Sequence, residues 1–183
     1  MEQASDNYLI EQILEGRTEC FSALMERYDK PVFSLIVKIV DNRQDAEELT
    51  QDVFLKAFRS LFSFRHDSSF STWLYRIAWN AAVSATRKQQ NDWLPLDDDL
   101  ATDLADEDAE NEVENMSGNE QTERLHKALG QLPPDDRALI TMFYMQDKTT
   151  DEISRISGLS LPNVKTRLHR IRKRLFTLMT KQY

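Results

Sequence analysis

The sequence predicts an all-α fold with two small helical domains, an N-terminal helical bundle and a C-terminal helix-turn-helix domain, joined by a flexible acidic linker. Apolar residues recur at helical spacing on both sides of the middle of the chain, and its 183 residues include only 4 Gly and 5 Pro. Residues 1–91 carry 13 acidic and 11 basic side chains, 92–120 carry 12 acidic and none basic, and 121–183 carry 6 acidic and 12 basic. Because dense like charge with few apolar residues supplies no core, the linker is assigned to 92–120.

The first half of the N-terminal domain reads as three helices. Asp6 is placed to cap a first helix that ends at Gly16. A second helix is predicted from about Thr18 to Tyr28, and Pro31 is expected to start a third, since proline fits the first turn of a helix. A turn at residues 41–42 follows.

Residues 45–62 form the first predicted helix with a surface of interest. Its core face repeats every four residues from Leu49 to Leu61. The opposite face carries polar residues around a single leucine: Glu48, Gln51, Asp52 and Leu55. An apolar anchor framed by polar side chains fits a partner surface, whereas a lone exposed leucine is commonly incidental. The residues alone leave both interpretations open.

The next helix, predicted for residues 71–88, is rich in aromatic side chains. Trp73 is expected on the core side, while Tyr75 and Trp79 are expected on the opposite, exposed side with Arg76 and Asn80. Exposed rings beside Arg and Asn suit unstacked bases, because aromatic rings stack on bases and amides read their edges. The alternative is that these rings close the helical core.

The C-terminal segment 151–175 reads as two short helices joined by a turn at Gly158. In the second helix an apolar stripe faces inward, made of Val164, Leu168, Ile171 and Leu175. From residue 162 to residue 183 there are seven Lys or Arg and no Asp or Glu. A basic face alone is commonly just solvated, but the turn, stripe and missing acids together favour a helix that enters the DNA major groove.

Other classes of function find little support in the sequence. The single cysteine, Cys20, permits no disulfide within the chain and is expected to be a small buried apolar residue. We expect a cytoplasmic protein without membrane insertion, because neither a signal peptide nor an apolar run of ~18 residues is visible. His66, His126 and His169 are scattered, and no catalytic, metal-binding or cofactor motif is found, so we expect no enzyme activity, metal or cofactor.

Three segments in this order resemble the extracytoplasmic-function (ECF) class of bacterial RNA polymerase sigma factors. They are DAEELTQDVFLKAF (45–58), FRHDSSFSTWLYRIAWNAAV (64–83) and LPPDDRALITMFYMQDKTTDEISRISGLSLPNVKTRLHRIRKRL (132–175). The resemblance implies that 1–91 is sigma region 2, 92–120 a linker and 121–183 sigma region 4. It further implies core RNA polymerase, promoter DNA and an anti-sigma factor as partners.

The resemblance also implies roles for individual residues. Glu48, Gln51, Asp52 and Leu55 would bind the polymerase clamp. The loop of Arg65, His66, Asp67, Ser68 and Ser69 would hold a flipped base of the −10 element. Along the −10 strand would lie Trp73, Tyr75, Arg76, Trp79, Asn80, Arg87 and Lys88. The −35 element and its phosphates would be met by Asn163, Lys165, Thr166, Arg167, His169, Arg170 and Arg174.

Some positions depart from the pattern of this class. Ser84 stands where an acidic residue is common, Pro162-Asn163 replaces a frequent Gly-Thr, and Asp147-Lys148 replaces a small turn. The change at 162–163 falls on the reading edge of the helix and bears on promoter sequence, while the change at 147–148 is expected to be local.

Two other functions remain compatible with the residues. One is a conventional two-domain helix-turn-helix regulator that binds operators as a dimer without the polymerase. The other is a helical adaptor or inhibitor whose basic tail binds an acidic protein. Neither accounts for both the clamp-like helix and the aromatic helix.

Overall fold

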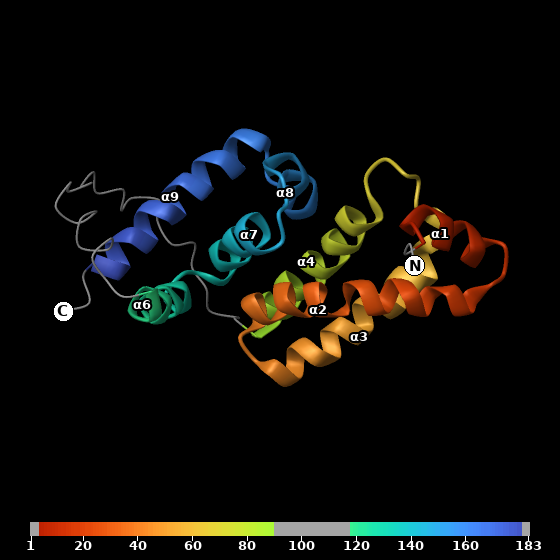
Figure 1. Ribbon diagram of the computed structural model, residues 1–183, viewed down its shortest axis with the longest axis horizontal. Helices are drawn as coiled ribbons and strands as arrows, with labels where there is room; N and C mark the ends of the chain where they lie inside the picture. Colours follow the sequence, from red (N-terminus) through yellow and green to blue (C-terminus); the bar gives the residue numbers. More distant parts are fainter. Residues whose placement is uncertain (1–3, 90–117, 181–183) are drawn as a thin grey trace.

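The computed structural model describes residues 4–89 and 118–180, and every regular element in these two ranges is helical (Figure 1). The N-terminal module contains α1 (Asp6–Leu14), α2 (Phe21–Val40), α3 (Arg43–Ser60) and α4 (Phe70–Gln89), with short 3-10 turns at Thr18–Cys20 and Leu61–Ser63. The C-terminal module contains α6 (Gly118–Gly130), α7 (Pro134–Met145), α8 (Thr150–Ser157) and α9 (Leu161–Thr180). The predicted all-α class with two helical domains is confirmed. Most of the predicted linker, residues 92–117, lies outside the described residues.

The first helix is capped one residue earlier than predicted. Ser5, in extended conformation, accepts a hydrogen bond from the backbone N–H of Tyr8, so Ser5 rather than Asp6 caps α1. Asp6 instead accepts a hydrogen bond from the Tyr28 hydroxyl at 2.5 Å and pairs with Arg27. The Asp6 carboxylate, predicted to cap α1, therefore links α1 to α2.

The expected helix break at Pro31 is wrong, because α2 runs through it from Phe21 to Val40. A proline inside a helix removes one backbone hydrogen bond. Continuing the helix, however, keeps Leu24 in register with the buried residues after the proline: Val32, Leu35, Ile36 and Ile39. Burial of this long apolar face outweighs the local cost.

Helix α3 begins where its sequence predicts a turn. Asp41 adopts a left-handed conformation with φ of 59°, and the Asn42 side chain accepts hydrogen bonds from the backbone N–H groups of Gln44 and Asp45. The inward face of α3 buries Val53 and Ala57, as the four-residue repeat predicts.

The helix-turn-helix forms as predicted. Thr149 and Glu152 make a reciprocal capping box at the start of α8, and Gly158 ends it with φ of +77°. The α9 stripe of Val164, Leu168, Ile171 and Leu175 is buried. The inward-facing prediction for this stripe is confirmed.

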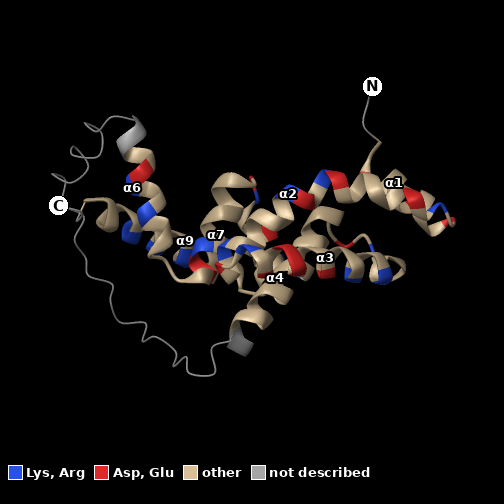
Figure 2. Ribbon diagram, turned by 90° about the horizontal axis from the view of Figure 1, so that it is seen from below, with Lys and Arg blue, Asp and Glu red and all other residues tan. Residues whose placement is uncertain are grey.

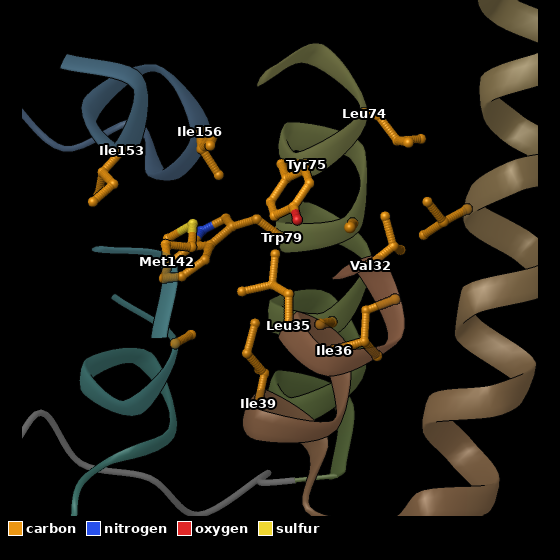
Figure 3. Packing of buried hydrophobic residues seen from close by; sticks show 14 of the residues in the cluster. Val32, Leu35, Ile36, Ile39, Leu74, Tyr75, Trp79, Met142, Ile153 and Ile156 are labelled. Carbon is orange, nitrogen blue, oxygen red and sulfur yellow. The ribbon is translucent and has the colours of Figure 1, made fainter. Parts of the chain in front are cut away.

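The two modules pack against each other, α2 on α7 and α4 on α8. Figure 3 shows the junction, where Trp79 of α4 reaches toward Met142, Tyr75 lies beside Trp79, and Ile153 and Ile156 lie on the same side as Met142. These five side chains belong to one apolar cluster that also includes the α2 residues Leu35, Ile36 and Ile39. Among the described residues, one continuous core therefore joins both modules.

Candidate functional site

The outer face of α3 is open to solvent. Glu48, Gln51 and Asp52 are exposed, and the Leu55 side chain is 47% exposed between them. A shallow hollow beside this face, between α3 and α4, is lined by Val40, Asp45, Glu48, Leu49, Asp52 and Ala85. The predicted exposure of Leu55 is confirmed, and the face combines acidic groups with one apolar anchor.

The loop before α4 presents its polar residues to solvent. Arg65, His66, Asp67 and Ser69 are exposed and Ser68 is half-buried. His66 has φ of 59°, and its ring lies 4.6 Å from the Phe64 ring, centroid to centroid. A non-glycine residue in this left-handed conformation turns the backbone sharply, so the loop bulges away from the core.

The end of this loop is fixed to α4. The Ser69 hydroxyl accepts a hydrogen bond from the backbone N–H of Thr72 at 3.2 Å, and the Ser69 carbonyl accepts one from Trp73. Ser69 thus caps α4 and holds the loop at a defined position relative to the helix.

The expected exposure of Tyr75 and Trp79 is wrong. Tyr75 is 3% exposed and Trp79 is 6% exposed, because α8 packs against α4 and Met142 of α7 lies beside Trp79 (Figure 3). Burial raises the pKa of the Tyr75 phenol above its ordinary value. The helix is apolar on more than one side, so a division into one core face and one solvent face does not describe it.

The other predicted residues of α4 divide between core and solvent. Trp73 is half-buried, with its ring 5.2 Å from Phe64 and 5.8 Å from Phe70. Arg76 and Asn80 are exposed, beside the covered aromatic face. The side chains of Arg87 and Lys88 lie outside the described residues.

Exposed polar and basic residues recur along α9, and the Lys and Arg positions are blue on its ribbon in Figure 2. The exposed residues are Asn163, Lys165, Thr166, His169, Arg170, Arg172, Lys173 and Arg174. Arg167 is less exposed than these residues, at 29% of its side chain, and its guanidinium Nε donates to Asp136 at 2.5 Å. The structure therefore brings together the residues predicted for −35 contacts, with Arg167 at their inner edge.

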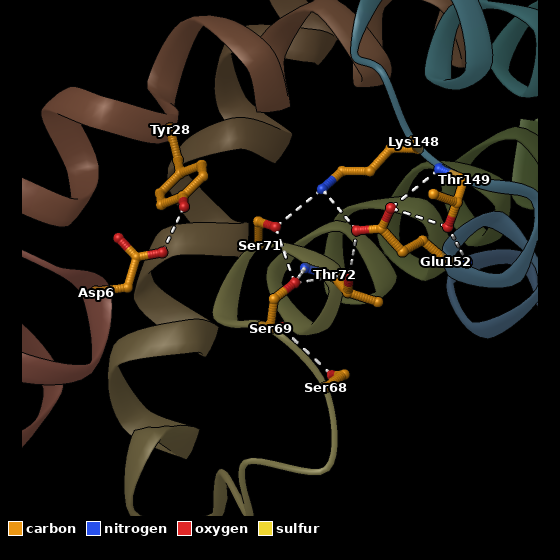
Figure 4. Close-up of polar contacts among 9 residues, drawn as sticks. All are labelled: Asp6, Tyr28, Ser68, Ser69, Ser71, Thr72, Lys148, Thr149 and Glu152. Carbon is orange, nitrogen blue, oxygen red and sulfur yellow. Dashed lines mark hydrogen bonds and ion pairs between the residues drawn. The ribbon is translucent and has the colours of Figure 1, made fainter.

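A polar network between the modules was missed by sequence reasoning (Figure 4). Lys148 Nζ lies 2.9 Å from Ser71 Oγ and 3.3 Å from Glu152 Oε1, while the Thr72 hydroxyl donates to Glu152 at 3.1 Å. Only the T-x-x-E capping box at 149–152 was readable in the sequence as a local signal. The contacts to Ser71 and Thr72 join residues about 80 positions apart and leave no local pattern.

The charge on Glu152 is stabilised by this network. Burial raises the pKa of Glu152, but the Thr149 backbone N–H, the Lys148 ammonium and the Thr72 hydroxyl outweigh burial and hold the pKa below the ordinary glutamate value. The carboxylate is therefore ionised at neutral pH, as the ion pair with Lys148 requires.

Two other kinds of site are absent from residues 4–89 and 118–180. No helix in these ranges has the length and apolar character needed to cross a membrane. No group of three or more His, Cys, Asp or Glu side chains there is arranged to hold a metal ion.

Comparison with known proteins gives two family matches and a series of relatives. The family models for Sigma-70 region 2 and Sigma-70, region 4 match residues 24–92 and 122–175. The RNA polymerase sigma-H factor of Pseudomonas aeruginosa is 31% identical over 93% of this chain and 92% of its own length. The ECF RNA polymerase sigma-E factor of Haemophilus influenzae is 33% identical over 94% of both chains.

Two solved structures share the fold. CnrH, determined in complex with the cytosolic domain of CnrY, superposes with a TM-score of 0.68 at 21% identity, over 97% of this chain and 99% of that one. The sigma factor RpoE of Bartonella quintana, determined with the anti-sigma factor NepR, has a TM-score of 0.65 at 20% identity, over 89% and 98%. By its family matches and its full-length relatives, the chain belongs to the ECF class of RNA polymerase sigma factors, which direct the polymerase to promoters at the start of transcription.

Proposed function

We propose a division of the initiation function between the modules. Residues 1–91 serve as region 2, binding the polymerase clamp and the −10 element, 92–120 as the tether, and 121–183 as region 4, reading the −35 element. Two weak DNA contacts on one tether share a high effective concentration, so the pair binds a promoter better than either module alone. The protein acts by binding and not as an enzyme, in the cytoplasm where polymerase and DNA meet.

The polymerase contact is assigned to the outer face of α3. Leu55 supplies an apolar anchor, and Glu48, Gln51 and Asp52 supply polar and acidic groups around it. Interfaces commonly place a buried apolar side chain inside a polar rim, which suits this arrangement. All four side chains are exposed in the structure, so the face is accessible in the free protein.

The −10 contact is assigned to the loop 65–69 and to α4. The bulged loop holds a flipped base, and Arg76 and Asn80 line the path of the strand. Trp73 provides a partly exposed ring for stacking, whereas Tyr75 and Trp79, buried in this structure, can offer theirs only when the C-terminal module has left α4. Arg87 and Lys88 are assigned to phosphates of the same strand.

The −35 contact is assigned to α9, and one observation carries the proposal. The helix buries an unbroken apolar stripe on one side and exposes its cations on the other, directly after a Gly158 turn. This is the geometry in which a recognition helix enters the major groove. Asn163, Thr166, Arg167 and Arg170 face bases or adjacent backbone, and Lys165, His169 and Arg174 supplement them at phosphates.

The experiment that tests the function uses the full chain with core bacterial RNA polymerase and a genomic fragment library. We expect transcripts that start downstream of a shared pair of elements, and that disappear when either the chain or the core enzyme is omitted. DNA binding by the free chain with no polymerase-dependent initiation would contradict the proposal and favour an operator-binding regulator. Absence of any promoter preference would favour an adaptor. Neither alternative is favoured by the family matches.

An anti-sigma factor is a further proposed partner. Two proteins that share this fold were solved as complexes, one of them with an anti-sigma factor. A protein captured on this chain qualifies only if, when purified, it abolishes the transcription assay and is displaced by excess sigma factor. Capture without inhibition would contradict the assignment.

A further inference from the structure

The turn between α7 and α8 packs against the N-terminal module. Asp147 takes a left-handed conformation with φ of 50°, and the Lys148 backbone N–H returns to the Met142 carbonyl at 3.0 Å. This tight turn directs the Lys148 side chain onto α4, where it is only 11% exposed. A lysine this buried needs partners for its ammonium group.

The Lys148 ammonium finds those partners on both modules. It lies 2.9 Å from the Ser71 hydroxyl of α4, 3.3 Å from Glu152 of α8 and 5.1 Å from the centre of the Tyr75 ring. An ammonium group has three donors, and an aromatic face attracts a cation. The side chain therefore bridges α8 to the first turn of α4 and covers the ring of Tyr75.

Other contacts between the modules surround this bridge. Thr72 of α4 donates to Glu152 at 3.1 Å, and Arg155 of α8 donates to the carbonyl of Asp67 at 3.0 Å. On the far side of the junction, Arg137 pairs with Asp41, and Gln146 donates to the Pro31 carbonyl at 3.0 Å. Polar contacts thus ring the apolar junction of Tyr75 and Trp79 with α7 and α8.

These contacts cover the aromatic part of the surface assigned above to the −10 element. Tyr75 and Trp79 are buried, and the Asp67 carbonyl of the base-binding loop is occupied by Arg155. Glu152 also places a carboxylate beside the start of α4, where the phosphates of a DNA strand would be repelled. Helix α8 and a DNA strand cannot occupy this face of α4 together.

We propose that Lys148 is the latch of a self-inhibited closed state, in which the C-terminal module occupies the −10 surface of the N-terminal module. This proposal rests on the proposed function of α4. Promoter DNA binds α4 only after α7 and α8 leave it, so the apparent affinity is lowered by the fraction of molecules that are open. Breaking the latch raises that fraction.

Two variants test the same contact from opposite modules. Lys148→Ala removes the ammonium, and Ser71→Ala removes its acceptor without touching α8 or its capping box. Lys30→Ala, at an exposed position of α2, is the control for loss of one positive charge. A change produced by Ser71→Ala cannot come from local loosening of α8, since Ser71 lies in the other module.

Opening is measured as the rate at which a thiol reagent labels position 142, in a Met142→Cys, Cys20→Ser background. Met142 lies in the junction and is fully buried, so its labelling rate follows the open fraction even when that fraction is small. We expect Lys148→Ala to speed labelling about tenfold, the effect of losing one charged hydrogen bond, with a smaller gain for Ser71→Ala and none for Lys30→Ala.

The consequence for function is measured separately, as the affinity of each full-length variant for promoter DNA in the presence of core polymerase. The latch predicts the same order of variants, with Lys148→Ala strongest. Unchanged labelling in both variants would overturn the latch, and faster labelling without tighter promoter binding would overturn its inhibitory role. A wild-type chain that initiates no transcription would instead contradict the proposed function, while the labelling rates would still report on the latch.

Discussion

Arg167 of α9 lies 2.5 Å from Asp136 in the first turn of α7, measured from Nε to Oδ1, so a cation of the recognition helix is held by a carboxylate of its own module. Asp135 lies 4.0 Å from the same guanidinium. The pair links α9 to the first turn of α7, within the C-terminal module.

We therefore expect Arg167→Ala and Asp136→Ala each to lower the free energy of unfolding by about 1–2 kcal/mol, since the first leaves the Asp136 carboxylate without its partner and the second leaves the guanidinium with only the longer contact to Asp135. The double variant should lose less than the sum of the single losses. Chemical denaturation of all four proteins gives the coupling energy. Strictly additive losses would show that the pair contributes nothing.

Arg170 should behave differently, because it is exposed on the outer face of α9. If Arg170 meets a phosphate, Arg170→Ala lowers the slope of log affinity against log salt concentration by about 0.9 for promoter DNA bound by the holoenzyme. Lys30→Ala removes a positive charge elsewhere and should leave the slope unchanged. Equal slopes for wild type and Arg170→Ala would remove Arg170 from the phosphate contacts.

Leu55 tests the polymerase face without disturbing the fold, since its side chain is 47% exposed. We expect Leu55→Asp to weaken binding to core polymerase by at least about tenfold, because a central apolar anchor is replaced by a charge. The free energy of unfolding should stay within about 0.5 kcal/mol of wild type, as for most surface substitutions. Glu11→Ala, on the exposed side of α1, is a control expected to bind normally. Normal binding by Leu55→Asp would move the clamp contact elsewhere.

Gly158 allows a direct test of the turn. Its φ of +77° is unfavourable for side chains, and no atom lies within 4 Å of where a Cβ would stand. Gly158→Ala should therefore cost about 1–2 kcal/mol through backbone strain alone, with a smaller cost for Gly158→Asn, because asparagine tolerates this conformation better. Denaturation midpoints of the two variants check this order, which steric clash would reverse.

Tyr75 gives the closed state a pH signature. Burial raises its pKa above the ordinary value of 10.0, so the closed state favours the neutral phenol. The stability that Tyr75 contributes is fully present below pH 10 and is lost as pH rises further, when the open state ionises and the closed state does not. Ultraviolet titration of tyrosinate should show a late component that Tyr75→Phe removes.

Tyr28 also titrates late, because burial and its hydrogen bond to Asp6 raise its pKa, so Tyr75→Phe should remove only part of the late absorbance. Lys148→Ala should shift the Tyr75 component toward the ordinary value by opening the junction. A Tyr75→Phe titration identical to wild type would mean that Tyr75 is already exposed in solution.

The sequence predicted best what is local. The stripe on α9, the Gly158 turn and the exposed Leu55 all follow from periodicity or turn chemistry within about a dozen residues. Pro31 was misjudged because tertiary packing overrode its local preference. Tyr75 and Trp79 were misjudged because α4 is covered on two sides, once by its own bundle and once by α8.

Lys148 shows why the contacts between the modules could not be predicted from the sequence. The residues next to Lys148 in the sequence predict only a turn, and its hydrogen-bond partner Ser71 is 77 positions away. A contact between modules depends on two surfaces at once, and no spacing within either surface records it.

The shared core has a consequence for how the free protein behaves in a crowded solution. If the modules separated, the apolar side chains around Trp79 and those around Met142 would both face water, and such patches adhere to one another and to other proteins. Packing the two modules together shields both apolar patches from water until another surface binds one of them. The polymerase and its promoter then compete with the C-terminal module for the N-terminal module. Only a surface that buries the same apolar side chains can keep the two modules separated.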